Sequence, residues 1–464
     1  MAHNISTRLL ILCLCFGISA CSYFDEEEKA PLEGDRMSLY DFEKSLQQDP
    51  NTQFGLDGSE EFQRLTALPE SLRGQTDQEI DLVAPWVNKF WPQVGGYPNH
   101  TMKHVAFSTN EPDRIWSSSI GRGSSKRLPL TSAPIVADGK VFTLNTRAQV
   151  AAFDQNSGRE LWIRDIIRQG EDEVVIGGGL AFSGGKLFAT NGFNEVIAMD
   201  PSDGRILWRA DTKSPIRAAP AAVPGRVFVS TLDNQTLALN ATNGQRLWSH
   251  RGLSGSAGIL GAATPAVTRD AVFTAYNSGE VYALQIDTGL ELWVQNLSPL
   301  ARVAGRTMIS DIRALPVADN GIIYATSLSN RMSAINARTG EPVWQSPIGS
   351  ATTPWVSGNR LFAIETQNTL VSLDTEDGDV VWQTPLPQFE DAEDREDPIS
   401  WQGPLLAGGR LMVFGSHGIV QEHNPTNGEI IREWNARGDI RLPVAVADQT
   451  LFIVDEDGDI SAWQ

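Results

Sequence analysis

The chain has 464 residues, of which 41% are hydrophobic, so it is long enough for two or three ordinary domains or for one large repeat array. Its formal net charge at pH 7 is −20, and no basic stripe interrupts the acidic balance. Because the phosphates of nucleic acid would repel such a chain, this composition excludes nucleic acid as a partner.

The N-terminal segment has the organisation of a secretory signal peptide. Arg8 supplies the positive charge, an apolar run covers residues 9–18, and the letters ISAC end the segment at residues 18–21. These four residues resemble the lipobox of bacterial lipoproteins, which implies that residues 1–20 are removed and that Cys21 is acylated. An ordinary signal peptide is the alternative, and it would leave Cys21 as a free thiol. The apolar run is too short to span a bilayer.

All three cysteines (Cys13, Cys15 and Cys21) lie in this segment, so the remaining chain has none to form a disulfide. By the same resemblance, a serine rather than an aspartate at position 22 favours sorting to the outer membrane. The expected location is therefore the periplasmic face of the outer membrane, with a lipid anchor.

Residues 21–90 are predicted to form an acidic tether, or arm, that carries one short helix. The run Asp25-Glu26-Glu27-Glu28 and scattered Pro and Gly residues are typical of a solvated linker. A capping-box pattern followed by apolar residues at roughly helical spacing predicts the helix over residues 38–48. This helix is either a surface helix or a docking segment.

A repeated pattern occupies the rest of the chain, and the segment Ala152–Trp162 (AFDQNSGRELW) is a clear copy. Alanine is followed two residues later by aspartate, then after four by glycine and after four more by tryptophan. Asp154 can accept backbone N–H groups in a turn, and Gly158 supplies a positive φ. Burial of Trp162 removes ~150–250 Å² from water, an upper bound of ~4–6 kcal/mol. The other copies end at Trp208, Trp248, Trp293, Trp344, Trp382 and, less regularly, Trp434.

Each repeat contains four short β-branched runs separated by Gly, Asn or Asp turns, over about 45 residues, the length of a β-propeller blade. The last repeat, from Pro443 to Trp463, stops after its third strand. The segment Arg114-Ile115-Trp116 is a tryptophan strand with no repeat before it. Placing it beside residues 459–463 completes a blade. The sequence therefore predicts an all-β, eight-bladed propeller of four-stranded antiparallel blades over residues 91–464, with its last blade completed by an N-terminal strand.

These repeats resemble the tryptophan docking pattern of the pyrroloquinoline-quinone propeller family. Two of its subfamilies are the quinoprotein dehydrogenases and the BamB lipoproteins of the outer-membrane β-barrel assembly machinery. Eight blades, little length beyond them and a cysteine-free body resemble the BamB subfamily from Trp91 to Gln464. The resemblance implies a non-catalytic scaffold, with no cofactor and no metal, that assists assembly and insertion of β-barrel proteins. Its implied partners are BamA, the other subunits of the assembly complex and unfolded outer-membrane proteins.

In the BamB subfamily, the loops that meet BamA join the third blade to the fourth and the fourth to the fifth. Here these loops are residues 253–264 and 300–315. Two positions depart from the family pattern, since Leu260 stands where arginine is frequent and Arg313 where a second aspartate is common. The candidate partner-binding residues are Ile259, Leu260, Gly261, Asp311 and Arg313.

Two adjacent large apolar residues, Ile259 and Leu260, are costly to expose in a Gly-rich loop unless something covers them. A partner would cover them at the centre of an interface, with Asp311 at its polar rim. Alternatively, the two side chains fold back over the mouth of the propeller channel.

A quinone-dependent periplasmic dehydrogenase is the alternative function. That subfamily uses a vicinal cysteine disulfide, a Ca²⁺ ion and a catalytic aspartate, whereas the body of this chain has no cysteine. A lectin-like or envelope-polymer binder is a third class that a propeller could support.

Three polar motifs are predicted to be structural. Residues 455–459 lack the ligand spacing of an EF-hand and match the position of a turn between strands. His100 and His104 lack the glutamate of a zinc helix, so we expect a surface pair. The acidic run 390–397 is expected to be a solvated loop, with a basic partner as the alternative.

The lipobox resemblance generates the first prediction. Cys21→Ala should release the protein into the soluble periplasm or block its processing, because the acceptor thiol for the lipid is lost. Fractionation followed by salt and carbonate washing of the membranes measures this. A variant that is processed normally and stays tightly membrane-bound would contradict the lipoprotein assignment.

Overall fold

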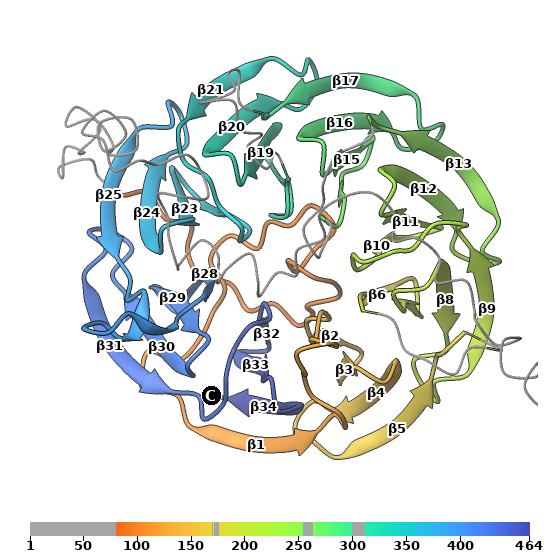
Figure 1. Cartoon of the computed structure of the whole chain (residues 1–464), viewed down its shortest axis with the longest axis horizontal. Coiled ribbons are helices and arrows are strands. Elements are labelled where there is room, and N and C mark those ends of the chain that lie inside the picture. Colours follow the sequence, from red (N-terminus) through yellow and green to blue (C-terminus); the bar gives the residue numbers. More distant parts are fainter. Residues whose placement is uncertain (1–79, 169, 171–175, 254–262, 299–310) are drawn as a thin grey trace, which may run out of the picture. The chain divides into compact units, whose positions relative to one another are not determined.

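The computed structural model describes residues 80–168, 170, 176–253, 263–298 and 311–464. These residues form eight four-stranded antiparallel sheets around a central axis, together with one two-stranded hairpin (Figure 1). The predicted eight-bladed propeller is therefore confirmed. Cys21 and the helix expected over residues 38–48 lie outside the described residues.

Within each blade, the first strand in the chain lies nearest the axis and the fourth lies at the rim, the last blade taking its fourth strand from the N-terminal side of the ring. Blade 1 consists of β2 (Ile135–Ala137), β3 (Lys140–Leu144), β4 (Gln149–Asp154) and β5 (Glu160–Asp165), and blade 2 consists of β6 (Gly179–Ser183), β7 (Lys186–Thr190), β8 (Glu195–Met199) and β9 (Ile206–Asp211). Blade 3 consists of β10 (Ala221–Val223), β11 (Arg226–Ser230), β12 (Gln235–Asn240) and β13 (Arg246–Arg251), and blade 4 consists of β14 (Ala266–Val267), β15 (Ala271–Ala275), β16 (Glu280–Gln285) and β17 (Glu291–Asn296).

The remaining blades follow the same order. Blade 5 consists of β18 (Val317–Asp319), β19 (Ile322–Ser327), β20 (Arg331–Asn336) and β21 (Pro342–Ser346), and blade 6 consists of β22 (Trp355–Ser357), β23 (Arg360–Glu365), β24 (Thr369–Asp374) and β25 (Val380–Pro385). Blade 7 consists of β28 (Trp401–Ala407), β29 (Arg410–Gly415), β30 (Ile419–His423) and β31 (Ile430–Asn435), and blade 8 consists of β32 (Ala445–Ala447), β33 (Thr450–Val454), β34 (Asp459–Trp463) and β1 (Arg114–Ser119).

The predicted ring closure is also confirmed. Strand β1 pairs antiparallel with β34, and Trp116 lies opposite Ala462 in this ladder. The backbones of Asp113 and Gln464 extend the pairing with two reciprocal hydrogen bonds of 2.9 and 3.0 Å. The eighth blade therefore depends on both ends of the described chain.

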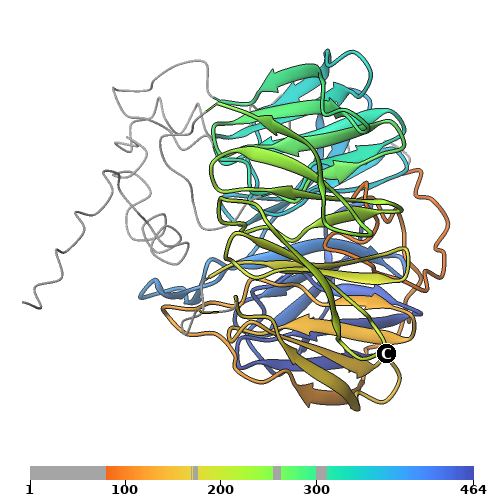
Figure 2. The same cartoon turned by 90° about the vertical axis from the view of Figure 1, so that its right-hand side faces the viewer.

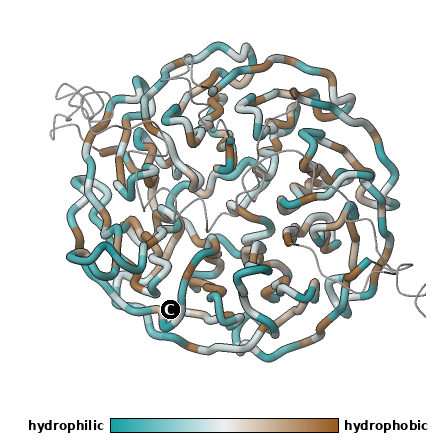
Figure 3. Tube along the Cα trace, in the orientation of Figure 1, coloured by the Kyte–Doolittle hydropathy of each residue, from teal (hydrophilic) through white to brown (hydrophobic). Residues whose placement is uncertain are grey.

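The hydrophobic core is divided among the junctions between blades. Apolar stretches recur all round the ring in Figure 3, and most clusters of buried side chains combine residues of adjacent blades. Sheet packing between neighbours thus stabilises the ring in the way that stacked repeats do.

The repeated tryptophans cross these junctions. Trp162, on the outer strand of blade 1, packs on the Asp–Gly turn of blade 2, where a β-carbon added to Gly204 would lie 2.6 Å from the indole. The indole also donates its N–H to a carbonyl oxygen of the same turn. These bonds join Trp116 to Gln155 (3.1 Å), Trp162 to Pro201 (3.1 Å), Trp208 to Ala241 (3.3 Å), Trp248 to Ile286 (2.9 Å), Trp293 to Ala337 (2.9 Å), Trp344 to Thr375 (2.9 Å) and Trp382 to Pro425 (2.9 Å).

Residues 86–106, called the strap below, run once round the inner edges of the blades (Figure 1). The two ends of the strap pair with each other, since Trp86 N donates to His104 O at 3.1 Å and Ala106 N donates to Trp86 O at 2.8 Å. Successive strap residues form hydrogen bonds with blades 8, 1, 2, 3, 4, 5, 6 and 7, in that order. The bonded pairs, with the strap residue first, are Asn88–Asp448, Trp91–Val136, Pro92–Phe182, Gln93–Ala222, Pro98–Val267, Asn99–Ala318, Lys103–Trp355 and Val105–Leu406.

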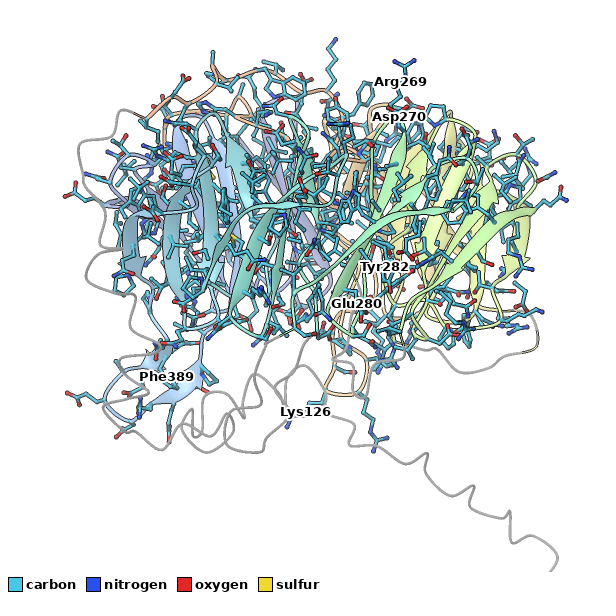
Figure 4. The ribbon with its side chains drawn as sticks, turned by 90° about the horizontal axis from the view of Figure 1, so that it is seen from above. Lys126, Arg269, Asp270, Glu280, Tyr282 and Phe389 are labelled. Carbon is cyan, nitrogen blue, oxygen red and sulfur yellow. The ribbon has the colours of Figure 1, made fainter. Side chains whose placement is uncertain are left out.

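Side views place the strap on one face of the ring (Figure 2). Figure 4 shows the same face marked by Arg269 and Asp270, whereas Lys126 and Phe389, which lie in connections between blades, mark the opposite one. The second face is called the loop face below.

The expectation that His100 and His104 form a surface pair is wrong, because both are buried in the strap. The Nε2 atom of His104 accepts the N–H of Gly409 at 2.8 Å, so its Nδ1 atom carries the proton and donates to Val83 O at 2.8 Å. His104 therefore acts as a structural hydrogen-bond donor, and both histidines belong to the buried part of the strap.

The acidic run 390–397 is more ordered than expected. It forms a hairpin of β26 (Phe389–Asp391) and β27 (Glu396–Pro398) on the loop face, with the guanidinium of Arg395 5.7 Å from the Phe389 ring centroid. Residues 455–459 form the predicted turn, in which Asp455 N donates to Asp459 O at 3.0 Å.

The tryptophan junction generates the second prediction. Gly204→Ala should lower the free energy of unfolding by about 2–5 kcal/mol, since a positive φ costs a β-carbon about 1–2 kcal/mol and displacement of the indole about 1–3 kcal/mol more. Gly139→Ala is the matched control, because Gly139 has nearly the same φ (69° against 71°) but no atom within 4 Å of an added β-carbon. Chemical denaturation measures the free energy of unfolding of both variants. An equal loss of this free energy in the two variants would contradict a stabilising contact between Trp162 and Gly204.

Candidate partner-binding site

The candidate site lies where the connections from blade 3 to blade 4 and from blade 4 to blade 5 leave and rejoin the sheets. The structure describes their ends, namely residues 252–253 and 263–265 of the first and residues 297–298 and 311–316 of the second. Ile259, Leu260 and Gly261 lie outside the described residues, so their assignment stays a prediction.

The first connection is held at its start by Asn234, in the turn between β11 and β12. The Asn234 amide nitrogen donates to Leu253 O at 2.7 Å and also to Asn277 Oδ1 at 2.6 Å and Ser278 Oγ at 3.1 Å. Asn234 has a φ of 55°, which asparagine tolerates better than most residues. One buried amide therefore ties the loop of blade 3 to the turn of blade 4.

The second connection is held by the same turn of blade 4, residues 276–279. Leu297 N donates to Gly279 O at 2.8 Å, and Ser298 Oγ donates to Ser278 O at 3.0 Å. Because Ser278 contacts Asn234 on one side and Ser298 on the other, the two loops begin on opposite sides of one rigid turn. The structure thus brings together the starts of the two loops that the sequence singled out.

The returning end of the second loop contains the two remaining candidate residues. Asp311 is 1% exposed, and its carbonyl oxygen accepts the N–H of Leu328 at 3.1 Å. Arg313 is half-buried two residues later. In this conformation Asp311 is therefore too buried to lie at the polar rim expected for it, and Arg313 is the more accessible of the two charges.

A polar and aromatic cluster supports the shared turn from within. Tyr276 shares hydrogen bonds with Thr236 Oγ1 at 2.8 Å and with His250 Nδ1 at 3.0 Å. His250 also packs against Tyr282, with ring centroids 4.6 Å apart. Burial lowers the pKa of His250, an effect that the carboxylate of Glu291 at 3.9 Å partly opposes, and burial raises the pKa of Tyr276. The rings of His250 and Tyr276 are therefore both neutral near pH 7. Figure 4 shows Tyr282 and Glu280, which belong to the same blade as Tyr276, near the loop face.

Apolar side chains lie exposed beside this site. Leu253, at the start of the first loop, is 62% exposed. On the outer strand of blade 4, Leu292 and Val294 are exposed, and Leu290 just before it is 65% exposed. Leu292 and Val294 lie two residues apart on β17, which is the edge strand of its sheet among the described residues.

Several residues of this site were not identified from the sequence. Asn234 and Ser278 are polar residues in short turns, and their position opposite each other across two blades has no local signal. His250 could have been suspected, because it follows Trp248 by two residues and therefore shares its strand face.

Within the described ranges, no three His, Cys, Asp or Glu side chains gather in a way that could hold a metal ion. The same ranges contain no helix of the length and apolar character needed to cross a membrane. The chemistry that the described side chains offer at this site is hydrogen bonding and apolar contact.

Comparison with known proteins gives consistent results. The model of the family described as "Outer membrane protein assembly factor BamB" matches residues 146–384. The protein of that name from Yersinia pestis is 22% identical over 235 residues, 50% of this chain and 58% of that relative, so the match spans less than two thirds of the relative's length.

Two solved structures are similar in fold. The crystal structure of BamB from Moraxella catarrhalis has a TM-score of 0.63 at 19% identity and covers 76% of this chain and 100% of that chain. Quinohemoprotein alcohol dehydrogenase from Comamonas testosteroni has a TM-score of 0.62 at 13% identity and covers 81% of this chain and 80% of that chain. At these identities the two likenesses show the fold alone.

The shared turn generates the third prediction. Asn234→Gly should lower the free energy of unfolding by about 1–3 kcal/mol, because glycine adopts the positive φ freely but leaves three part-buried acceptors without their donor. Asn320→Gly is the control, since Asn320 also has a positive φ, of 46°, and is exposed; we expect a change within about 0.5 kcal/mol there. Chemical denaturation measures both, and equal effects would mean that the Asn234 amide does not hold the loops.

Proposed function

Since the chain belongs to the family of the outer membrane protein assembly factor BamB, we propose that it is a non-catalytic scaffold lipoprotein that assists the assembly and insertion of β-barrel proteins into the outer membrane. In this proposal the loop face binds BamA. The lipid on Cys21 holds the protein at the periplasmic face of the outer membrane, and the predicted arm, residues 21–90, is the tether, except that its end from Trp86 onward belongs to the strap.

The observation that carries the proposal is the convergence of two interblade loops on the turn at residues 276–279. Asn234 and Ser298 bind opposite sides of this turn through bonds of 2.6 to 3.1 Å, so the loops leave a rigid base at a fixed separation. Loop ends that are held in this way need little ordering on binding, which favours affinity.

Apolar contact area supports the same surface. In the proposal, Ile259 and Leu260 provide the centre of the interface, Leu253 extends it, and Arg313 contributes to the polar rim. Interfaces of this make-up concentrate their binding energy in a few central apolar side chains.

The outer strands support a second part of the proposal, which is that extended segments of unfolded outer-membrane proteins bind at the rim. Among the described residues, each outer strand ends its sheet and offers unpaired backbone groups. Exposed aliphatic side chains precede most of the rim tryptophans, as at Ile115, Leu161, Leu207, Leu247, Leu292 and Val343. A strand added to such an edge gains main-chain hydrogen bonds and apolar contacts without needing one particular sequence.

The fourth prediction tests the proposed BamA contact. Replacing Ile259 and Leu260 together by serine should weaken BamA binding by about 30-fold or more, since loss of a hot spot costs at least about 2 kcal/mol. The melting temperature should stay unchanged, because the pair covers no core residue in this proposal. Co-purification from detergent-solubilised membranes and thermal melting measure the two effects.

The matched control replaces Ile430 and Ile431, an adjacent pair that is exposed on the outer strand of blade 7, by serine. Equal loss of BamA with this control would mean that the loop pair is not the contact. A melting temperature lowered by several degrees with BamA still bound would place the pair over the channel mouth instead. Bound quinone with dye-linked dehydrogenase activity in the purified protein would favour the dehydrogenase function.

A further inference from the structure

The strap is hydrogen-bonded to the strands into which the two candidate loops return. Val267 N, in the first strand of blade 4, donates to Pro98 O at 2.6 Å. In the first strand of blade 5, Ala318 N donates to Asn99 O at 2.9 Å, and the Asn99 amide donates back to Ala318 O at 3.2 Å. The strap therefore fixes the chain within a few residues of the end of each loop.

His100 reaches still closer to the second loop. Its Nδ1 atom lies 2.8 Å from Pro316 O, the residue that follows the loop directly. Burial lowers the pKa of His100 to about 4, so the ring is neutral near pH 7. Because a carbonyl oxygen can only accept, the single ring proton is on Nδ1 and the bond is a donated one.

Close packing and an ion pair also fix residues 315–319, at the end of the second loop. A β-carbon added to Gly95 would lie 3.0 Å from both the His100 ring and the Leu315 side chain, so the strap backbone is closely packed against the end of the loop. Lys103 forms an ion pair with Asp319, whose side chain is 7% exposed. Residues 315–319 are thus held by a hydrogen-bonded histidine, a reciprocal amide bond, close packing and a salt bridge.

We propose that strap residues 98–103 position the partner-binding loops, so that affinity for the partner depends on side chains that the partner does not touch. The strap holds the returning ends of both loops from the channel, while the turn at residues 276–279 holds their starts. Each loop is then fixed at both ends. This inference rests on the proposed function for the identity of the partner, BamA. The positioning of the loop ends by the strap does not depend on that function.

The other half of the strap offers a control, because it makes contacts of the same kind far from these loops. At blade 8 the Asn88 amide donates to Val446 O, and at blade 1 Trp91 N and O bond to Val136 at 2.8 Å each. Loss of these contacts should lower stability without changing residues 311–319.

The fifth prediction compares two variants of the full-length protein. The loop-side variant carries Asn99→Ala and His100→Ala, and the control carries Asn88→Ala. Hydrogen exchange of residues 263–267 and 311–319 should be at least ten times faster in the loop-side variant and unchanged in the control. Affinity for detergent-solubilised BamA should fall about tenfold in the first and less than twofold in the second, and melting temperatures are recorded for both.

His100→Gln serves as a rescue variant, since its amide can still donate to Pro316 O, and we expect it to restore most of the protection. Asn99→Ala alone, which removes the bond to Ala318 O, replaces the double variant if that fails to fold. Unchanged exchange at residues 311–319 in the loop-side variant, or an equal increase in the control, would overturn the positioning role. Absence of BamA binding by the unmodified protein would overturn the proposed function alone, because the exchange comparison decides the role of the strap without a partner.

Discussion

The contact between an indole ring and a glycine of the next blade is the interaction on which the ring depends. Trp162 packs on Gly204 in the space that a side chain would occupy, and its N–H binds Pro201 O at 3.1 Å. Because the tryptophan and its glycine belong to different blades, each copy of the repeat stabilises a junction rather than a single sheet. A ring of such junctions behaves as a closed set of nearest-neighbour interfaces.

The junction between blades 7 and 8 differs, because the fourth strand of blade 8 is β1 and no Asp–Gly turn joins it to β34. There Trp434 packs against Trp463, with ring centroids 5.0 Å apart, and donates its N–H to Glu422 at 3.0 Å. Glu422 is fully buried and is neutralised by Arg410 and Arg432 at 3.0 and 2.6 Å. Arg410 also donates to Thr109 O at 2.7 Å, so the closing junction is linked to the segment that leads into β1.

Residues from the N-terminal side of the propeller thus close the ring twice, at the rim through β1 and at the inner edge through the strap. The rim closure is a backbone ladder, and the strap combines backbone pairing with side-chain hydrogen bonds such as those of Gln93 and Trp355. The loop face is left to the connections between blades, and these can vary while the sheets stay fixed. The crystal structures of BamB from Moraxella catarrhalis and of quinohemoprotein alcohol dehydrogenase from Comamonas testosteroni are similar to this chain in fold.

The sequence by itself determined the number of blades and their closure, because the strand alternation, the Asp–Gly turn and the spacing to each tryptophan are local patterns. The resemblance of the repeats to the BamB subfamily, together with the blade count, singled out the two interblade loops at residues 253–264 and 300–315. Only the tertiary structure decided that each tryptophan docks on the following blade, that His100 and His104 are buried, and that Asn234 and Ser278 join the two loops. The reason is physical: the strap and the shared turn rest on contacts between single residues far apart in the chain, and such contacts impose no period on the sequence.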